Sequence, residues 1–204
     1  MRTRRIYPYV PIELAAVCSA AFILLLLYLS EARAKFPEPL NIQMPGSSGF
    51  YCGISGFGEG MILVGRGKVM LDFDEDIRRQ TLINMGKRYN MQFTPAELET
   101  FETMNIVGVP LTQLKSYLAT YKAESPAYYA QQGISIEIGK NELGDWISSA
   151  KQAQRALKNS GIRMALMADS STKSPLIKRV MDILVERKIH SVNLVTDTKR
   201  WERQ

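Results

Sequence analysis

One acidic side chain in this sequence lies inside an apolar run, where a charge has a chemical consequence. Glu13 stands near the start of residues 10–29, VPIELAAVCSAAFILLLLYL, which are otherwise mostly apolar or small. A carboxylate within a membrane crossing costs about 2–3 kcal/mol on insertion scales unless it faces a partner, water or the interface. Glu13 therefore has two interpretations: a proton carrier facing a channel between helices, or an interfacial acid beside Tyr7 and Tyr9.

A second acidic group has the residue types of a metal site but the setting of a helix start. Four acids, Asp72, Asp74, Glu75 and Asp76, stand close together in the chain. Acids in the first turn of a helix are stabilised by the helix dipole, and helical spacing follows at Ile77 and Leu82. We assign the acids to the start of a helix and predict no metal site.

Few other residues could support catalysis. Gly65-Arg66-Gly67-Lys68 resembles the end of a phosphate loop, but Val69 stands where Ser or Thr is needed. His190 is the single histidine, which excludes the common His-rich metal sites. No nucleophile, base and orienting group occur together at a recognisable spacing. We expect neither enzymatic activity nor a cofactor.

The apolar run predicts one transmembrane helix over residues 10–30. At about 1.5 Å per residue, roughly 19 residues span about 28 Å, the hydrocarbon thickness of a bilayer. Arg2, Arg4 and Arg5 precede the run without an acid, whereas Glu31 and Arg33 follow it together. The excess of positive charge keeps the N-terminus in the cytoplasm. In a bacterium, the rest of the chain then lies in the periplasm, anchored to the inner membrane and its lipid.

A cleaved signal peptide is the alternative, since residues 32–34, Ala-Arg-Ala, have small residues at the spacing that a signal peptidase recognises. The apolar run is longer than the usual signal core, so we favour the uncleaved anchor. A lipoprotein is disfavoured because most of the run follows Cys18. Small residues in the run suit close helix packing in lipid; the candidates are Ala16, Cys18, Ser19 and Ala20.

Composition limits the remaining functions. The chain has 204 residues, a net charge of +6 and a pI near 9.3. Its basic residues are scattered among acids after residue 72, so we expect no nucleic-acid partner. Two cysteines, Cys18 and Cys52, form no disulfide framework within a domain. The predicted organisation is a basic cytoplasmic tail (1–9), the membrane helix (10–30), a Pro/Gly-rich flexible linker (31–60) and a periplasmic α/β domain (61–204).

Periodicity in residues 61–204 predicts a small α/β sandwich with a helical insertion. A hairpin is expected at residues 61–73, a helix to residue 89, a capped helix from Thr94 to about residue 105, and a short helix around residues 111–118. Residues 122–133 are expected to form a loop. The C-terminal part predicts strand 134–138, a helix from Asn141 that ends at Gly161, strand 162–169, helix 174–188 and strand 190–196. The expected inward side chains of the last two helices are Leu143, Ile147, Ala150, Ala153 and Leu157, then Ile177, Val180, Met181 and Leu184.

The C-terminal residues resemble a known family. Residues 161–197, GIRMALMADSSTKSPLIKRVMDILVERKIHSVNLVTD, contain a strand, Ala-Asp, a short polar loop, Pro175, a helix and a final strand. With the arginines at the N-terminus, the single crossing and the Pro-rich tether, they resemble the ExbD/TolR family of biopolymer-transport subunits. Residues 78–118 resemble a longer ExbD found in Bacteroidetes, so the resemblance covers about residues 60–197.

The resemblance implies a component of a proton-driven motor. In such complexes ExbD-like helices lie inside a ring of multi-helix ExbB-like subunits, and their periplasmic domains pair and act on a TonB-like protein that opens outer-membrane transporters. An intramembrane Asp, three residues after a Pro, carries the protons. This sequence departs from that pattern, because Pro11 follows Pro8 at that distance and Leu14 follows Pro11. Glu13 is the only nearby acid.

Three hypotheses follow. Glu13 replaces the Asp, or this chain is the passive member of a mixed pair with another ExbD-like chain. In a different class, the chain is a membrane-anchored periplasmic adaptor or peptidoglycan-binding module with no role in proton flow. The domain is expected to form a homo- or heterodimer through an edge strand, at residues 134–138 or 190–196.

Overall fold

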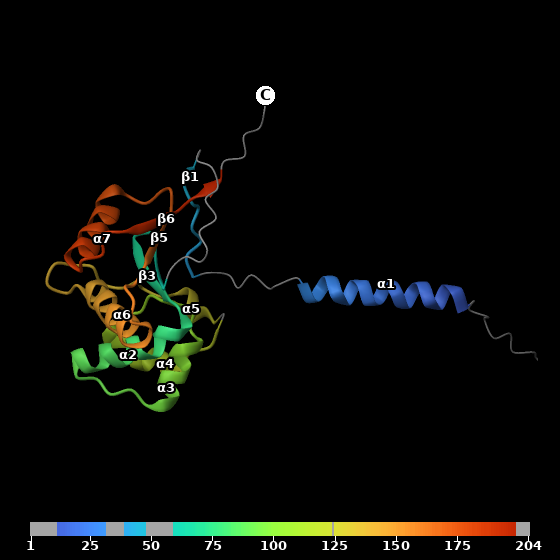
Figure 1. Cartoon of the computed structure of the whole chain (residues 1–204), viewed down its shortest axis with the longest axis horizontal. Helices are drawn as coiled ribbons and strands as arrows, with labels where there is room; N and C mark the ends of the chain where they lie inside the picture. Colours follow the sequence, from blue (N-terminus) through green and yellow to red (C-terminus); the bar gives the residue numbers. More distant parts are fainter. Residues whose placement is uncertain (1–11, 32–38, 48–58, 124, 199–204) are drawn as a thin grey trace, which may run out of the picture. The chain divides into compact units, whose positions relative to one another are not determined.

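The structure, a computed structural model, describes residues 12–31, 39–47, 59–123 and 125–198, with side chains described for 17–26 only in the first helix. The chain divides into two units, Met1–Phe36 and Pro37–Gln204 (Figure 1). Unit 1 contains helix α1, Ile12–Glu31. The predicted cytoplasmic tail, Cys52 and residues 32–38 of the predicted linker lie outside the described residues.

Unit 2 is built on the predicted hairpin, which consists of β2, Gly60–Gly65, and β3, Lys68–Phe73. The two strands pair antiparallel in register from Gly60 with Phe73 to Gly65 with Lys68. Arg66 and Gly67 form the turn with φ of 51° and 75°, respectively. Positive φ at both central residues is typical of the tight hairpin turn that matches strand twist. The glycine-rich segment therefore serves as a hairpin turn.

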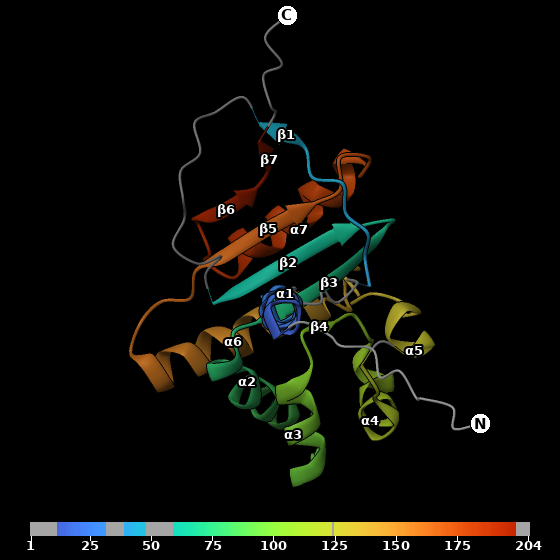
Figure 2. The same ribbon diagram turned by 90° about the vertical axis from the view of Figure 1, so that its right-hand side faces the viewer.

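Five strands form the main sheet, in the order β4-β3-β2-β5-β6. β5, Met164–Ala168, pairs parallel with β2, and β6, Val192–Val195, pairs parallel with β5. β4, Ile106–Val107, pairs antiparallel with the far side of β3. Figure 2 shows β6, β5, β2 and β3 side by side. The α/β class and the strands at 61–73, 162–169 and 190–196 are confirmed.

Most predicted helices are present near their expected bounds. They are α2, Glu75–Tyr89; α3, Pro95–Thr103; α4, Leu111–Thr120; α6, Glu142–Lys158; and α7, Ser174–Glu186. The predicted cap of α3 is confirmed, because Thr94 Oγ1 accepts from the Glu97 N–H while Glu97 Oε2 accepts from the Thr94 N–H. This reciprocal bonding satisfies two donors that a helix start leaves free.

The helices cover one face of the sheet, where the larger core lies. Trp146 of α6 is fully buried at its centre, stacked on Phe101 with ring centroids 5.7 Å apart and 6.2 Å from the Phe73 ring. Strand residues alternate between faces, so every second side chain of β2, β3 and β5 enters this core. These strand residues are Ile62, Val64, Val69, Leu71, Phe73, Met164, Leu166 and Ala168.

Residues 39–47, within the predicted linker, cover part of the opposite face. Leu40 is 2% exposed and packs with Leu63, Met70 and Ile106 in a second, smaller core. The carbonyl of Gln43 accepts a 2.8 Å hydrogen bond from the Ser170 N–H. β1, Gly46–Ser47, then pairs parallel with β7, Asp197–Thr198. Residues 39–47 are therefore an integral part of the domain, although their composition predicts a flexible linker.

Two predictions about residues 122–138 are wrong. Residues 134–138 form no strand: only an isolated bridge joins Glu137 to Lys140, and Ile138 is 91% exposed. The Ile134 N–H still donates a 2.8 Å hydrogen bond to the Val69 carbonyl of β3. Further along β3, however, the pairing strand is β4. The predicted loop contains α5, Pro126–Tyr129, which starts with a Ser cap and Pro in its first turn.

Two predicted inward side chains face solvent. Leu157 is 54% exposed, since it lies in the last turn of α6 beyond the sheet. Met181 is 38% exposed on the flank of α7, and Ile183 is buried in the core instead. The other inward residues of α6 are buried, as are Val180 and Leu184 of α7, while Ile177 is half-buried against the core.

Candidate functional site

Glu13, the candidate proton carrier, lies in the first turn of α1. Its side chain and that of Ala16 are outside the described residues. Successive helix positions are about 100° apart, so positions 13, 16 and 20 fall on one face of α1. Ser19 borders this face, whereas Cys18 lies on the opposite side of the helix. The helical register thus aligns the acid with Ala16 and Ala20, two of the four predicted packing residues.

The side chains of α1 that the structure describes, those of residues 17–26, are all exposed. The exposed fraction is 66% for Val17 and Leu24, and 50% for Leu26, the lowest of the large apolar residues. Cys18, Ser19 and Ala20 are also exposed. Contiguous apolar surface of this kind marks a site of contact with lipid or with other proteins.

Within the residues that the structure describes, no helix is both long enough and apolar enough to cross a membrane. The crossing at residues 10–30, the inner-membrane location and the proton-carrying role of Glu13 stay predictions. The alternative cleavage site at residues 32–34 lies outside the described part of the chain.

The acidic cluster at residues 72–76 has structural roles. Asp72 Oδ1 lies 3.3 Å from Arg78 Nη2, and Asp74 precedes α2 at its cap position. Asp76 Oδ2 lies 2.7 Å from Lys158 Nζ, which ties the start of α2 to the end of α6. In the described part of the chain, no group of three or more His, Cys, Asp or Glu side chains could hold a metal ion. The helix start predicted for this cluster is confirmed.

A polar cluster that the sequence did not reveal joins three helices through Asp145. Its Oδ1 lies 3.2 Å from Arg88 Nε and 3.3 Å from Arg187 Nη2, and its Oδ2 accepts a 2.6 Å hydrogen bond from Tyr89. Partial burial, together with this bond to a carboxylate, raises the pKa of Tyr89 to about 12. From the sequence alone, Asp145 is expected only to be an acid in the first turn of a helix. Its partners cannot be identified in this way, because they lie far away in the chain.

The candidate pairing edge of the domain is β6, at the end of the sheet order. β6 pairs with β5 on one side, and Leu194 is 57% exposed. His190 lies exposed just before this strand. The other segment predicted to pair in a dimer, residues 134–138, is not a strand. Of the two predicted pairing strands, only β6 is therefore present. Unpaired strand edges expose donors and acceptors to which another strand can bind.

Comparison with protein-family models, curated proteins and solved structures finds no match for this chain.

Proposed function

We propose that this chain is an inner-membrane subunit of a proton-motive-force-driven motor of the ExbB–ExbD type, which energises TonB-dependent outer-membrane transport. Two features support the proposal. The sequence of residues 60–197 resembles the ExbD/TolR family, and the chain joins an apolar helix to an α/β domain. In this proposal α1 lies in the membrane among ExbB-like subunits, and unit 2 acts in the periplasm.

The observation that carries the proposal is the exposure of the apolar surface of α1. From Val17 to Leu26 every described side chain is exposed, whereas unit 2 buries its own core. Because α1 is apolar on all sides, lipid alone or a ring of other helices would cover it. The alignment of Glu13 with Ala16 and Ala20 would let a neighbouring helix approach closely beside the acid.

In the periplasm, we propose that unit 2 pairs with a second ExbD-like chain through the edge of β6 to which no other described strand is paired. The pair would present two copies of the domain to a TonB-like protein. A homodimer places β6 against its own copy, and a mixed pair places it against the strand of a related subunit. In the mixed pair, the proton-carrying acid would belong to the partner.

Co-purification tests the assembly. The full chain is tagged at its C-terminus, extracted from native membranes in mild detergent, and its companions are identified by mass spectrometry. An ExbB-like multi-helix protein among them supports the motor. A second ExbD-like chain in addition assigns this chain to a mixed pair. Recovery alone or with cell-wall fragments overturns the motor and favours the anchored adaptor.

Substitution at Glu13 tests the proton-carrying role separately. Glu13→Gln removes the charge with little change of shape, and Glu31→Gln is the matched control at the other end of α1. If Glu13 carries protons, only Glu13→Gln abolishes energised uptake, while the complex still assembles. Uptake that survives Glu13→Gln but fails when the chain is deleted assigns this chain to the passive place in a mixed pair.

A further inference from the structure

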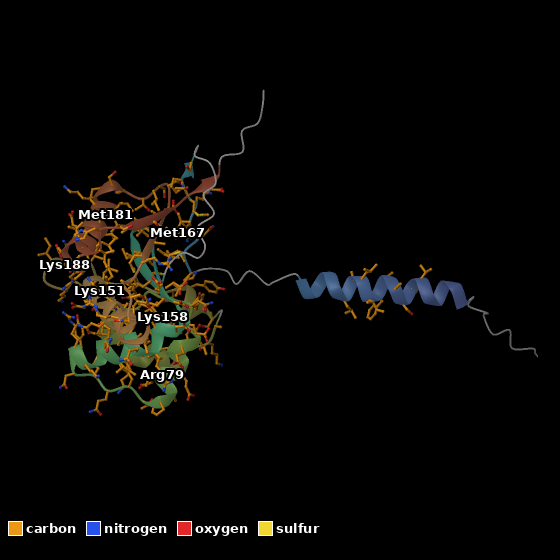
Figure 3. All side chains as sticks on the ribbon, in the orientation of Figure 1. Arg79, Lys151, Lys158, Met167, Met181 and Lys188 are labelled. Carbon is orange, nitrogen blue, oxygen red and sulfur yellow. The ribbon has the colours of Figure 1, made fainter. Side chains whose placement is uncertain are left out.

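A groove rich in unpaired positive charge lies between α6 and the turn that joins α7 to β6. Two adjacent hollows of about 320 and 350 Å³ make up this groove, and both are lined by Lys151 and Lys188. The first hollow also contacts Arg155 and Arg187, and the second contacts Arg163 and His190. We call these two hollows the basic groove. Figure 3 labels Lys151 and Lys188, which lie near each other on the domain.

Three cations of the basic groove have no acidic partner among the described residues: Lys151, Arg155 and Lys188. Lys151 Nζ is held by a 3.2 Å hydrogen bond to the Arg187 carbonyl, which leaves its charge uncompensated. The other cations of the lining are paired, Arg163 with Glu59 at 3.0 Å and Arg187 with Asp145 at 3.3 Å. The single acid of the lining, Glu186, is paired with Arg179. The groove therefore carries net positive charge.

The backbone of Lys188 adds an independent observation. Lys188 follows α7 with φ of 58°, a left-handed conformation that favours Gly or Asn. The left-handed residues that directly follow α2 and α6 are Asn90 and Asn159, whereas Lys188 is the second residue after α7. A lysine has no conformational advantage over Gly or Asn in this turn, but its charge lies at the C-terminal end of α7 and in the basic groove. The dipole of α7 favours such a charge, and so would an anionic ligand in the groove.

We propose that the basic groove binds an acidic peptide segment of a partner protein. The unpaired cations would bind carboxylates, and uncharged polar side chains of the lining would bind the peptide backbone; these are Ser148, Gln152, Ser191 and Asn193. The two adjacent hollows extend the groove in one direction, which suits a linear peptide that can place several carboxylates along it. The proposal concerns unit 2 and does not depend on the motor.

The test uses the full chain in maltoside micelles and a fluorescein-labelled peptide of alternating Glu and Gly. We expect saturable binding in fluorescence anisotropy that weakens as salt is added, and no binding of the matching Gln peptide. The combined variant Lys151→Gln, Arg155→Gln, Lys188→Gly should weaken binding about tenfold or more, because it removes the unpaired charges. Lys188→Gly alone keeps the turn, so it should weaken binding without loss of thermal stability.

A matched variant separates the groove from net charge. Lys87→Gln, Lys115→Gln and Lys122→Gln together remove the same charge from exposed lysines elsewhere that form no ion pair with another described residue. Equal weakening by both combined variants, or no saturable binding by the unmodified chain, overturns the proposal. Saturable binding of a short-chain phosphatidylglycerol in place of the peptide, lost in the groove variant, also overturns it and assigns the groove to lipid phosphate.

Discussion

The Tyr89 hydroxyl donates a 2.6 Å hydrogen bond to Asp145 Oδ2 and so joins the last turn of α2 to the first turn of α6. Arg88 and Arg187 contact the other oxygen of the same carboxylate. One acid thus connects α2, α6 and the end of α7. This connection matters for the site because α6 and the end of α7 form the walls of the basic groove.

The first prediction concerns the ionisation of Tyr89. Its pKa is raised from 10.0 to about 12, so the stabilisation from its neutral hydroxyl is present below pH 10 and is lost as the pH rises through 12. Asp145→Asn removes the carboxylate charge and should lower this pKa. Ultraviolet difference titration measures it, with Tyr89→Phe identifying the signal. The exposed Asp182→Asn is the control; an unchanged Tyr89 titration in Asp145→Asn would contradict the geometry.

The second prediction concerns acid stability and the pair Glu59–Arg163. Burial of Glu59 acts to raise its pKa, but hydrogen bonds from the side chain and backbone of Arg163 outweigh burial and lower it below 4.5. The stabilisation from the pair is therefore present above the unfolded pKa and is lost as the pH falls through the lowered one. At neutral pH, Glu59→Gln should have a lower free energy of unfolding than the unmodified chain. In acid, the two proteins should have the same free energy of unfolding. Denaturant unfolding of the full chain measures both.

Glu99→Gln is the control for this experiment, since Glu99 is exposed on α3 and has no ion pair among the described residues. Its unfolding free energy should follow that of the unmodified chain at every pH. A difference between Glu59→Gln and the unmodified chain that persists at low pH would show that the loss comes from packing instead of charge.

Local patterns predicted the elements that depend on local signals. The hairpin at residues 61–73 has a glycine turn between apolar runs, and α3 has a Thr-Pro start with Glu97 in the capping box. These features act over a few residues, so sequence alone specifies them. The α/β class followed from the alternation of such segments.

Contacts between distant residues could not be predicted in this way. Leu40 lies in a Pro/Gly-rich segment, yet Leu63, Met70 and Ile106 bury it. Asp145 gains its partners from α2 and from the end of α7. The three isoleucines of residues 134–138 alternate as in a strand, but β4 pairs with β3 instead. In each case the outcome depends on contacts between residues that are far apart in the chain, which no local pattern contains.

The third prediction tests whether residues 39–47 belong to the domain. Leu40→Ala removes a side chain that is 2% exposed, and we expect it to lower the free energy of unfolding by about 2–5 kcal/mol. Ile138→Ala, at a position that is 91% exposed, should change it by less than about 0.5 kcal/mol. Urea unfolding followed by the fluorescence of buried Trp146 measures both variants. Equal stability of the two variants would contradict the packing of Leu40.

The fourth prediction concerns Gly86, in the last turn of α2. Alanine normally stabilises a helix relative to glycine by about 1 kcal/mol. Here an added Cβ would lie 2.6 Å from the Met91 carbonyl oxygen and 3.2 Å from the Phe93 ring. Met91 is fixed at this place by its own 2.8 Å hydrogen bond to the Gly86 carbonyl, so it cannot move away without losing that bond. Gly86→Ala should therefore destabilise the domain by about 1–3 kcal/mol.

Gly161→Ala is the matched variant, because nothing lies within 4 Å of the Cβ it would add and the residue has no left-handed φ. It should leave the free energy of unfolding unchanged or raise it by up to about 1 kcal/mol, since alanine restricts the unfolded chain. The two glycine variants thus have opposite expected signs in the same urea experiment. If Gly86→Ala were as stable as Gly161→Ala, the chain after Asn90 would not fold back against α2, and the contact of Met91 and Phe93 with the main core would have to be abandoned.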